Sequence, residues 1–178
     1  MPSADVKAIP LIRRCWWRQW WRLIAPLLVV VLLALGLPAA PAHAAAASCA
    51  PINRGDVEGL FERWNAALTS GDAATVAALY SADALLLPTL SNQPRDTPAA
   101  IRDYFEGFLA RDPLGRIDSR QISLGCNTAL DAGTYSFRLT GPNGSATEWV
   151  QARFTFVYVN GPEGWRIQHH HSSLQPPG

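Results

Sequence analysis

Lysine and cysteine are scarce in this 178-residue chain. Lys7 is its one lysine, so every basic residue after position 44 is an arginine, and these arginines form no run. Residues 1–44 hold five of the 15 basic residues and one of the 14 acidic residues, which leaves ten against 13 and a net charge of −3 for residues 45–178. This balance excludes a broad basic surface, so we expect no nucleic-acid partner.

The first 44 residues have the pattern of a secretory signal. Basic residues from Lys7 to Arg22 precede an apolar run at 23–37, and the small-residue sequence APAHAA follows. The pattern predicts a periplasmic or secreted protein that is cleaved near Ala44, by either the general or the twin-arginine export route. The apolar run has about 15 residues and a bilayer span needs about 20, so membrane contact would come only through an uncleaved leader.

Two of the three cysteines remain after cleavage, Cys49 and Cys126. An even number of cysteines in an oxidising compartment favours a disulfide. We therefore predict a Cys49–Cys126 bridge, which would stabilise the fold by roughly 4 kcal/mol if loop entropy dominates. Two buried free thiols are the alternative.

Helical patterns come first in the remaining chain. Asn53 and Asp56 form a capping-box pattern at the start of one helix, and Gly71 ends that helix. Asp72 can cap a second, shorter helix that includes Tyr80. The first helix carries one apolar stripe: Val57, Leu60, Phe61, Trp64 and Leu68.

A short strand and a third helix follow. Residues 84–88 have the pattern of a buried strand that a proline ends. Thr97 and Pro98 predict the start of the third helix, because threonine caps helices and proline suits the first helical position. Asp112 and Pro113 end it.

After Pro113 the pattern changes to strands. We predict four, at 116–127, 129–140, 146–159 and 165–173, and the turns GPNGS and NGPEG join the last three as an antiparallel meander. Helices followed by a long antiparallel sheet give an α+β fold.

The strand at 149–158 is apolar on both faces. Phe154 and Phe156 take even positions, whereas Trp149 and Val157 take odd ones, and successive side chains of a strand point to opposite faces. Helices cover one face of such a sheet. We therefore expect the other face to meet a second copy of the chain, in a homodimer or a larger homo-oligomer.

In this order, the elements resemble the cone-shaped nuclear-transport-factor-2-like (cystatin-like, SnoaL-like) fold, in which three N-terminal helices pack on a curved antiparallel sheet. Within that superfamily the chain is most similar to the association domain of calcium/calmodulin-dependent protein kinase II, in its stand-alone bacterial form. The resemblance places one domain at 53–173, after a lead-in at 45–52 and before a tail at 174–178. It is carried by SGDAATVAALY, LLLPTLSN, IRDYFEGFL, DAGTYSFRLT and GWRIQHHHSS.

The resemblance implies self-association and a cavity lined by arginines. The matching positions are Arg138 and Arg153, and His169 and His171 match the family's closing His-x-His. Residues two apart on a strand share a face, so these four side chains could converge on one cavity. Two guanidinium and two imidazole groups there would attract a small acidic molecule through charge-assisted hydrogen bonds.

The wall of that pocket would include Trp64 and Tyr104, which lie on the apolar stripes of their helices. A purely structural interpretation is also open. In that case the arginines pair with Glu148, Asp131 or Glu106, and the histidines bond backbone carbonyl groups.

Other chemistry finds little support in the sequence. His-x-His is half of a metal site and no third ligand is evident, so we expect no metal. The chain lacks a serine-nucleophile motif, cofactor fingerprints and the glycine-rich loop of kinases. We expect no cofactor and no kinase activity.

We therefore interpret the chain as an exported ligand-binding and self-association module, and we favour a non-catalytic protein. One alternative is a cone-fold enzyme of the isomerase, cyclase or oxidoreductase type that acts on a small molecule in the same pocket. Proton-transfer chemistry of that kind needs an interior carboxylate whose pKa is raised. The other alternative is a structural oligomer with a vestigial pocket.

Overall fold

The computed structural model of the protein describes residues 48–141 and 144–176. The predicted secretory leader and its cleavage point near Ala44 lie outside these described residues. Within the two ranges, no helix is both long enough and apolar enough to cross a membrane.

Each helix begins at the capping residue that the sequence predicts. The Asn53 side chain accepts a hydrogen bond from the Asp56 amide at 3.1 Å, and the Asp56 carboxylate accepts one from the Asn53 amide at 2.8 Å. The side chains of Asp72 and Thr97 cap the other two helices by accepting hydrogen bonds from amides of the first turn. The helices are α2 (Arg54–Leu68), α3 (Ala73–Ala77) and α4 (Pro98–Leu109).

Helix α3 is shorter than predicted, because Tyr80 begins strand β1 (Tyr80–Leu87). Tyr80 is buried and pairs with Ile167 in the last strand. That parallel pairing joins segments far apart in the chain, so helical spacing alone could not reveal it.

The strands form one five-stranded sheet in the order β1-β5-β4-β3-β2. Its last four strands are an antiparallel meander, and β1 pairs in parallel with β5. The predicted α+β class and the predicted strands are confirmed, with ends that differ by a few residues. The four strands after β1 are β2 (Leu114–Gly125), β3 (Thr128–Leu139), β4 (Glu148–Gly161) and β5 (Gly164–Leu174).

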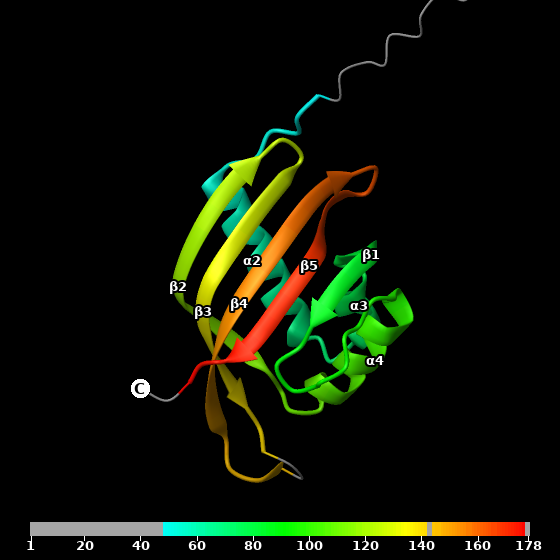
Figure 1. The fold of residues 1–178 in the computed structure, drawn as a ribbon. Helices are drawn as coiled ribbons and strands as arrows, with labels where there is room; N and C mark the ends of the chain where they lie inside the picture. Colours follow the sequence, from blue (N-terminus) through cyan, green and yellow to red (C-terminus); the bar gives the residue numbers. More distant parts are fainter. Residues whose placement is uncertain (1–47, 142–143, 177–178) are drawn as a thin grey trace, which may run out of the picture. The chain divides into compact units, whose positions relative to one another are not determined.

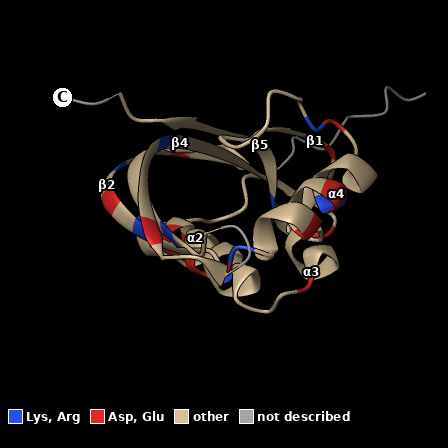
Figure 2. Cartoon of the chain, turned by 90° about the horizontal axis from the view of Figure 1, so that it is seen from below, with Lys and Arg blue, Asp and Glu red and all other residues tan. Residues whose placement is uncertain are grey.

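All three helices lie on one side of the curved sheet. Figure 1 shows α2 behind β3 and β4, and Figure 2 shows α2, α3 and α4 together on the same side. The hydrophobic core fills the space between them. It is unusually aromatic, and its fully buried members include Trp64, Tyr135, Tyr158, Phe61, Phe105 and Phe156.

The predicted disulfide is present between Cys49 and Cys126. It joins the lead-in before α2 to the turn between β2 and β3. The Ala50 amide also donates a 2.7 Å hydrogen bond to the Asn127 side chain in that turn. The lead-in is therefore attached to the end of the hairpin by a covalent bond and a hydrogen bond.

Candidate functional site

Two surfaces of the sheet can carry function, and they lie on opposite sides. The covered face packs against the helices and contains a small cavity. The open face, defined by the strand side chains that point away from the helices, has no covering element among the described residues.

The cavity lies between α2, α4 and the sheet. Its volume is about 30 Å³, which is room for about two water molecules. Its walls carry no charged side chain among the described residues. The lining residues are Trp64, Leu86, Pro88, Thr89, Leu90, Tyr104, Phe105, Phe108, Tyr135, Phe137, Leu139, Val150, Ala152, His170 and Ser172.

His170 is a buried titratable group in the wall of this cavity. It is 3% exposed, and burial lowers its pKa to about 3. Its ring stacks on Phe156 with centroids 4.0 Å apart. Its Nδ1 lies 2.9 Å from the Tyr80 hydroxyl, which accepts a 3.1 Å hydrogen bond from Trp64 Nε1. The imidazole is therefore neutral and held in place on one side.

Three hydroxyl groups form a second polar cluster in the cavity wall. Tyr135 donates to Ser172 Oγ, and Ser172 shares a hydrogen bond with Thr89. Burial raises the pKa of Tyr135, so its hydroxyl keeps its proton and acts as a donor. Ser172 and His170 are two residues apart on β5 and face the cavity together.

Trp64 and Tyr104 line this cavity as the sequence predicts, but the four basic candidates do not. Arg138, Arg153 and His171 are exposed, and His169 is partly exposed; all four belong to the open face. The predicted convergence of all six side chains on one pocket is therefore wrong. Burial lowers the pKa of His169, and the neighbouring His171 lowers it further.

Backbone geometry explains the error at the histidines. Strict alternation from the buried Ile167 would turn His169 and His171 toward the helices. A β-bulge inserts Gln168 into β5, because Val157 pairs with His169 whereas Tyr158 pairs with Ile167. The extra residue reverses the faces, so that His170 points inward. The sequence carries no clear signal for this bulge.

The arginines are outward for a simpler reason. Tyr135, Phe137 and Leu139 alternate inward on β3, which leaves Arg138 on the other face. Phe154 and Phe156 point inward on β4, so the neighbouring Arg153 points to the open face. The same alternation of apolar residues is present in the sequence and predicts outward positions for both arginines.

The alternative prediction, in which Arg138 and Arg153 pair with internal carboxylates, is wrong as well. Glu148 pairs with Arg111, Asp131 with Arg120, and Glu106 with Arg102. Arg138 and Arg153 form no ion pair with any residue in 48–141 or 144–176.

Asp131 belongs to the core and is fully buried. Burial raises its pKa, and the Arg120 guanidinium opposes that rise through bonds of 2.8 and 3.2 Å. Neither Asp131 nor Glu148 lines the cavity. The interior carboxylate that an isomerase-type mechanism needs is thus not supplied by these two residues.

The open face combines apolar and basic side chains. Trp149 is 57% exposed and Leu130 is 36% exposed. The Arg116 guanidinium lies over the Trp149 ring, 5.4 Å from its centroid. Together the described strands bring these outward residues onto it: Leu85, Leu87, Leu114, Arg116, Leu130, Thr134, Arg138, Trp149, Arg153, Val157, His169 and His171.

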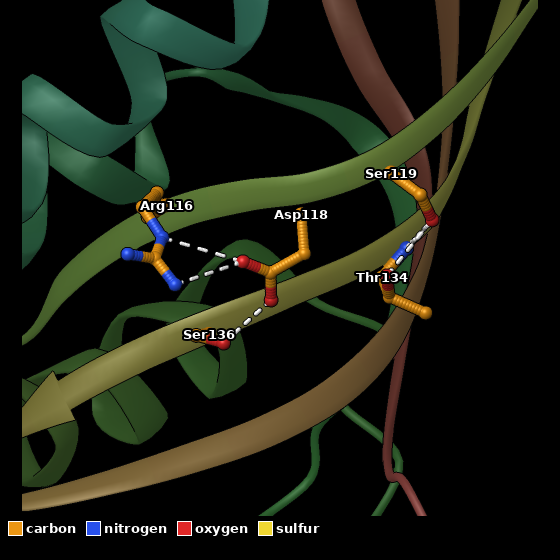
Figure 3. Close-up of polar contacts among 5 residues, drawn as sticks. All are labelled: Arg116, Asp118, Ser119, Thr134 and Ser136. Atoms are coloured by element: carbon orange, nitrogen blue, oxygen red, sulfur yellow. Dashed lines mark hydrogen bonds and ion pairs between the residues drawn. The ribbon is translucent and has the colours of Figure 1, made fainter.

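A second β-bulge places the carboxylate of Asp118 on the open face. Asp118 is the extra residue in β2, since Ile117 pairs with Tyr135 and Ser119 with Thr134. Its carboxylate accepts hydrogen bonds from the Ser136 hydroxyl and from Arg116 (Figure 3). Ser119 and Thr134 share a further bond between their hydroxyl groups, 2.8 Å long.

Comparison with known proteins identifies a family. Residues 53–176 match the calcium/calmodulin-dependent protein kinase II association domain. The crystal structure of a candidate association-domain protein from Xanthomonas campestris is 45% identical in sequence. Its TM-score is 0.68, and the match covers 75% of this chain and 95% of that one.

Two further structures share the fold at low identity. A candidate dehydratase of the nuclear-transport-factor-2-like family from Streptomyces avermitilis is 15% identical, with a TM-score of 0.62 over 69% of this chain and 97% of its own. A nuclear-transport-factor-2-like protein with a cystatin-like fold from Novosphingobium aromaticivorans is 14% identical. Its TM-score is 0.59, and the match covers 87% of this chain and 92% of that one.

Proposed function

Because the chain belongs to the calcium/calmodulin-dependent protein kinase II association-domain family, we propose that it is a self-association module whose copies meet through the open face of the sheet. The matched family is an association domain, which favours self-association. The nuclear-transport-factor-2-like fold also includes candidate enzymes, so the fold alone does not decide between assembly and catalysis.

The observation that carries the proposal is the composition of the open face. Leu114, Leu130 and Trp149 are large apolar residues on three neighbouring strands, and each is more than a third exposed. Leu114 and Trp149 flank Arg138 at one end of the face, and Leu130 lies beside Val157 toward the other end. Large apolar side chains exposed along one face of a sheet favour an interaction site there. Aromatic and arginine side chains, such as Trp149 and the Arg116 above it, are enriched where protein interfaces are strongest.

Charge on the same face supports a role for acidic molecules. Arg116, Arg138 and Arg153 lie on the open face, where Arg116 pairs with Asp118 and the other two form no ion pair with a described residue. Near the β4–β5 turn, Arg166 pairs with Glu163 at 3.6 Å. Two such faces would repel each other weakly. A small acidic molecule bound by Arg138 and Arg153 would reduce this repulsion, so ligand binding and assembly would strengthen each other.

We also propose that the protein works outside the cytoplasm, in the periplasm or after secretion. The Cys49–Cys126 disulfide supports this location, because such bonds persist in oxidising compartments. The signal-like pattern of residues 1–44 is the second support.

A matched pair of leucine substitutions tests the interface. Leu130 on β3 points to the open face, whereas Leu124 on β2 is 48% exposed and pairs with Ala129, whose side chain is buried on the covered side. We expect Leu130→Glu to weaken self-association about 100-fold or more, because it would bury an unpaired charge. Leu124→Glu should leave association unchanged. Sedimentation velocity over a concentration series measures both, and equal behaviour of the two variants would reject the open face as the interface.

A double substitution tests the acidic ligand separately. We expect Arg138→Ala combined with Arg153→Ala to abolish the stabilisation of the assembly by citrate at low ionic strength. The protomer should stay folded, since both side chains are exposed and exposed substitutions change stability by about 0.5 kcal/mol. Thermal melts and sedimentation with and without citrate check this. A citrate effect that survives the double substitution would contradict the assigned role of these arginines.

A further inference from the structure

His169 and His171 are polar side chains of the open face that the rest of the chain does not use. The sequence has three consecutive histidines, and the β-bulge in β5 turns the middle one inward and the outer two outward. Of the three, only the inward His170 forms a side-chain hydrogen bond with a described residue. The outward two, which we call the histidine pair, are therefore available to a ligand from outside the chain.

The two rings of the histidine pair can bind one metal ion. Residues two apart on a strand share a face, with Cα atoms about 7 Å apart, and zinc binds imidazole nitrogen at roughly 2.0–2.1 Å. His169 is half-buried and His171 is exposed. Burial, and then the neighbouring His171, lowers the pKa of His169, which favours the neutral imidazole that binds metal ions. The pair is therefore one half of a zinc site.

One chain does not complete such a site. The ranges 48–141 and 144–176 contain no group of three or more histidine, cysteine or carboxylate side chains placed to hold a metal ion. Zinc in structural sites takes four ligands in a tetrahedron. The two missing ligands must come from water or from a second copy of the chain, which would supply another histidine pair.

The surroundings of the histidine pair favour the second copy. Four residues lie directly beside the pair in the sheet, and all four are outward, half-buried and uncharged. They are Leu85 and Leu87 on β1 and Thr155 and Val157 on β4. Apolar side chains gathered at the surface of one face favour contact with another protein.

The arginines of the open face determine where two copies can meet. Arg116, Arg138 and Arg153 lie in the rows of the sheet that cross β4 at 149–153, and the histidine pair lies in the rows at 155–157. When two copies meet through the same face, residues on the two-fold axis contact their own counterparts. An axis among the arginines would bring like charges together, which is unfavourable. An axis at the histidine pair avoids this contact, and it brings the two pairs together.

A metal ion also solves a problem that such a contact creates. The contact would bury four imidazole rings, and neither His169 nor His171 has a hydrogen-bond partner among the described residues of its own chain. Buried polar groups in folded proteins are nearly always satisfied. One zinc ion bound by all four rings would satisfy them together.

We propose that Zn²⁺ binds between two copies of the chain in a tetrahedral site formed by His169 and His171 of each copy. This proposal rests on the proposed self-association through the open face, since the site is incomplete without the second copy. Zinc binding and self-association therefore strengthen each other, because each favours the same assembled state.

A zinc titration of the untagged protein, first treated with EDTA, tests the proposal. Native mass spectrometry should find one zinc ion for every two chains. Sedimentation velocity should show that zinc strengthens self-association about tenfold or more. Mg²⁺ prefers oxygen ligands and should have no effect. One zinc ion per chain, or a self-association constant that zinc does not change, would overturn the site.

The measurement in EDTA distinguishes a failure of this site from a failure of the proposed function. Copies that associate in EDTA but bind no zinc would contradict the zinc site alone. Copies that stay single both in EDTA and with zinc would contradict both proposals. Leu130→Glu, which should weaken association, should weaken zinc binding as well. Zinc binding of parental strength by single Leu130→Glu chains would overturn a site shared between copies.

Glutamine substitutions at the three histidines test the ligands. We expect His169→Gln and His171→Gln each to abolish the effect of zinc on association, because glutamine is polar but lacks the imidazole nitrogen. His170→Gln removes the inward histidine and should keep one zinc ion for every two chains. Cobalt(II) in place of zinc should give the visible absorption of a four-coordinate site in the parent and in His170→Gln only. A full zinc effect in either outer variant would contradict the assigned ligands. Should His170→Gln fail to fold, the parent and the two outer variants still decide.

Discussion

His170 is a buried histidine that links three strands of the sheet. Its Nδ1 is used by a hydrogen-bonded chain from Trp64 through Tyr80, and its ring stacks on Phe156. Phe156 lies on β4 and Tyr80 on β1, so the ring joins the two strands that flank β5. Its Nε2 has no hydrogen-bond partner in the described part of the chain.

This burial makes stability depend on pH. The unfolded chain binds a proton at His170 below about pH 6.5, whereas the folded protein does so only near pH 3. Between these values the unfolded state holds more protons, so stability falls as pH falls. We expect a loss of about 2–3 kcal/mol from this residue between pH 7 and pH 4.5.

Urea unfolding across that pH range measures the effect. His170→Gln cannot titrate, so its free energy of unfolding should fall less steeply between pH 7 and pH 4.5 than that of the parent. His171→Asn removes an exposed histidine and should reproduce the parent slope. Parallel pH profiles for the parent and His170→Gln would mean that His170 is not held neutral.

At the scale of elements, the two β-bulges determine which side chains meet. The bulge at Gln168 turns His170 inward, and the bulge at Asp118 places a carboxylate beside Ser136. Local periodicity correctly predicted where the strands run. It could not predict the bulges, because an inserted residue changes the pairing between strands without changing the apolar pattern.

Gly133 allows β2 and β3 to approach each other beside the Asp118 bulge. A Cβ atom at this position would lie 2.0 Å from the Ser119 carbonyl oxygen, which is backbone and cannot move aside easily. We expect Gly133→Ala to lower the free energy of unfolding by about 1–3 kcal/mol through the resulting backbone shift.

Gly107 provides the matched control. It lies in α4, and a Cβ there would meet no atom within 4 Å. Gly107→Ala should raise the free energy of unfolding by about 0.5–1 kcal/mol, because alanine favours a helix over glycine. Chemical denaturation of both variants checks the pair, and a Gly133→Ala protein as stable as the parent would show that the strands tolerate the extra atom.

At the scale of the whole molecule, the two faces of the sheet have different properties. The covered face holds an aromatic core and a small cavity. The open face carries Trp149, Leu130, and the side chains of Arg138 and Arg153, which form no ion pair within the described residues. The fold class, the helix caps, the disulfide and the association-domain family could all be predicted, because each depends on local patterns or on motifs in register. The prediction that Arg138, Arg153, His169 and His171 face the cavity is wrong, because their faces depend on strand alternation and on one bulge.

Assembly through the open face is the central claim, and native mass spectrometry of the mature protein tests it most directly. We expect masses that are whole multiples of one chain, two or more, at micromolar concentration, and Leu130→Glu should shift them toward the mass of one chain. A single-chain mass at every concentration up to about 100 µM, with or without citrate, would contradict the account.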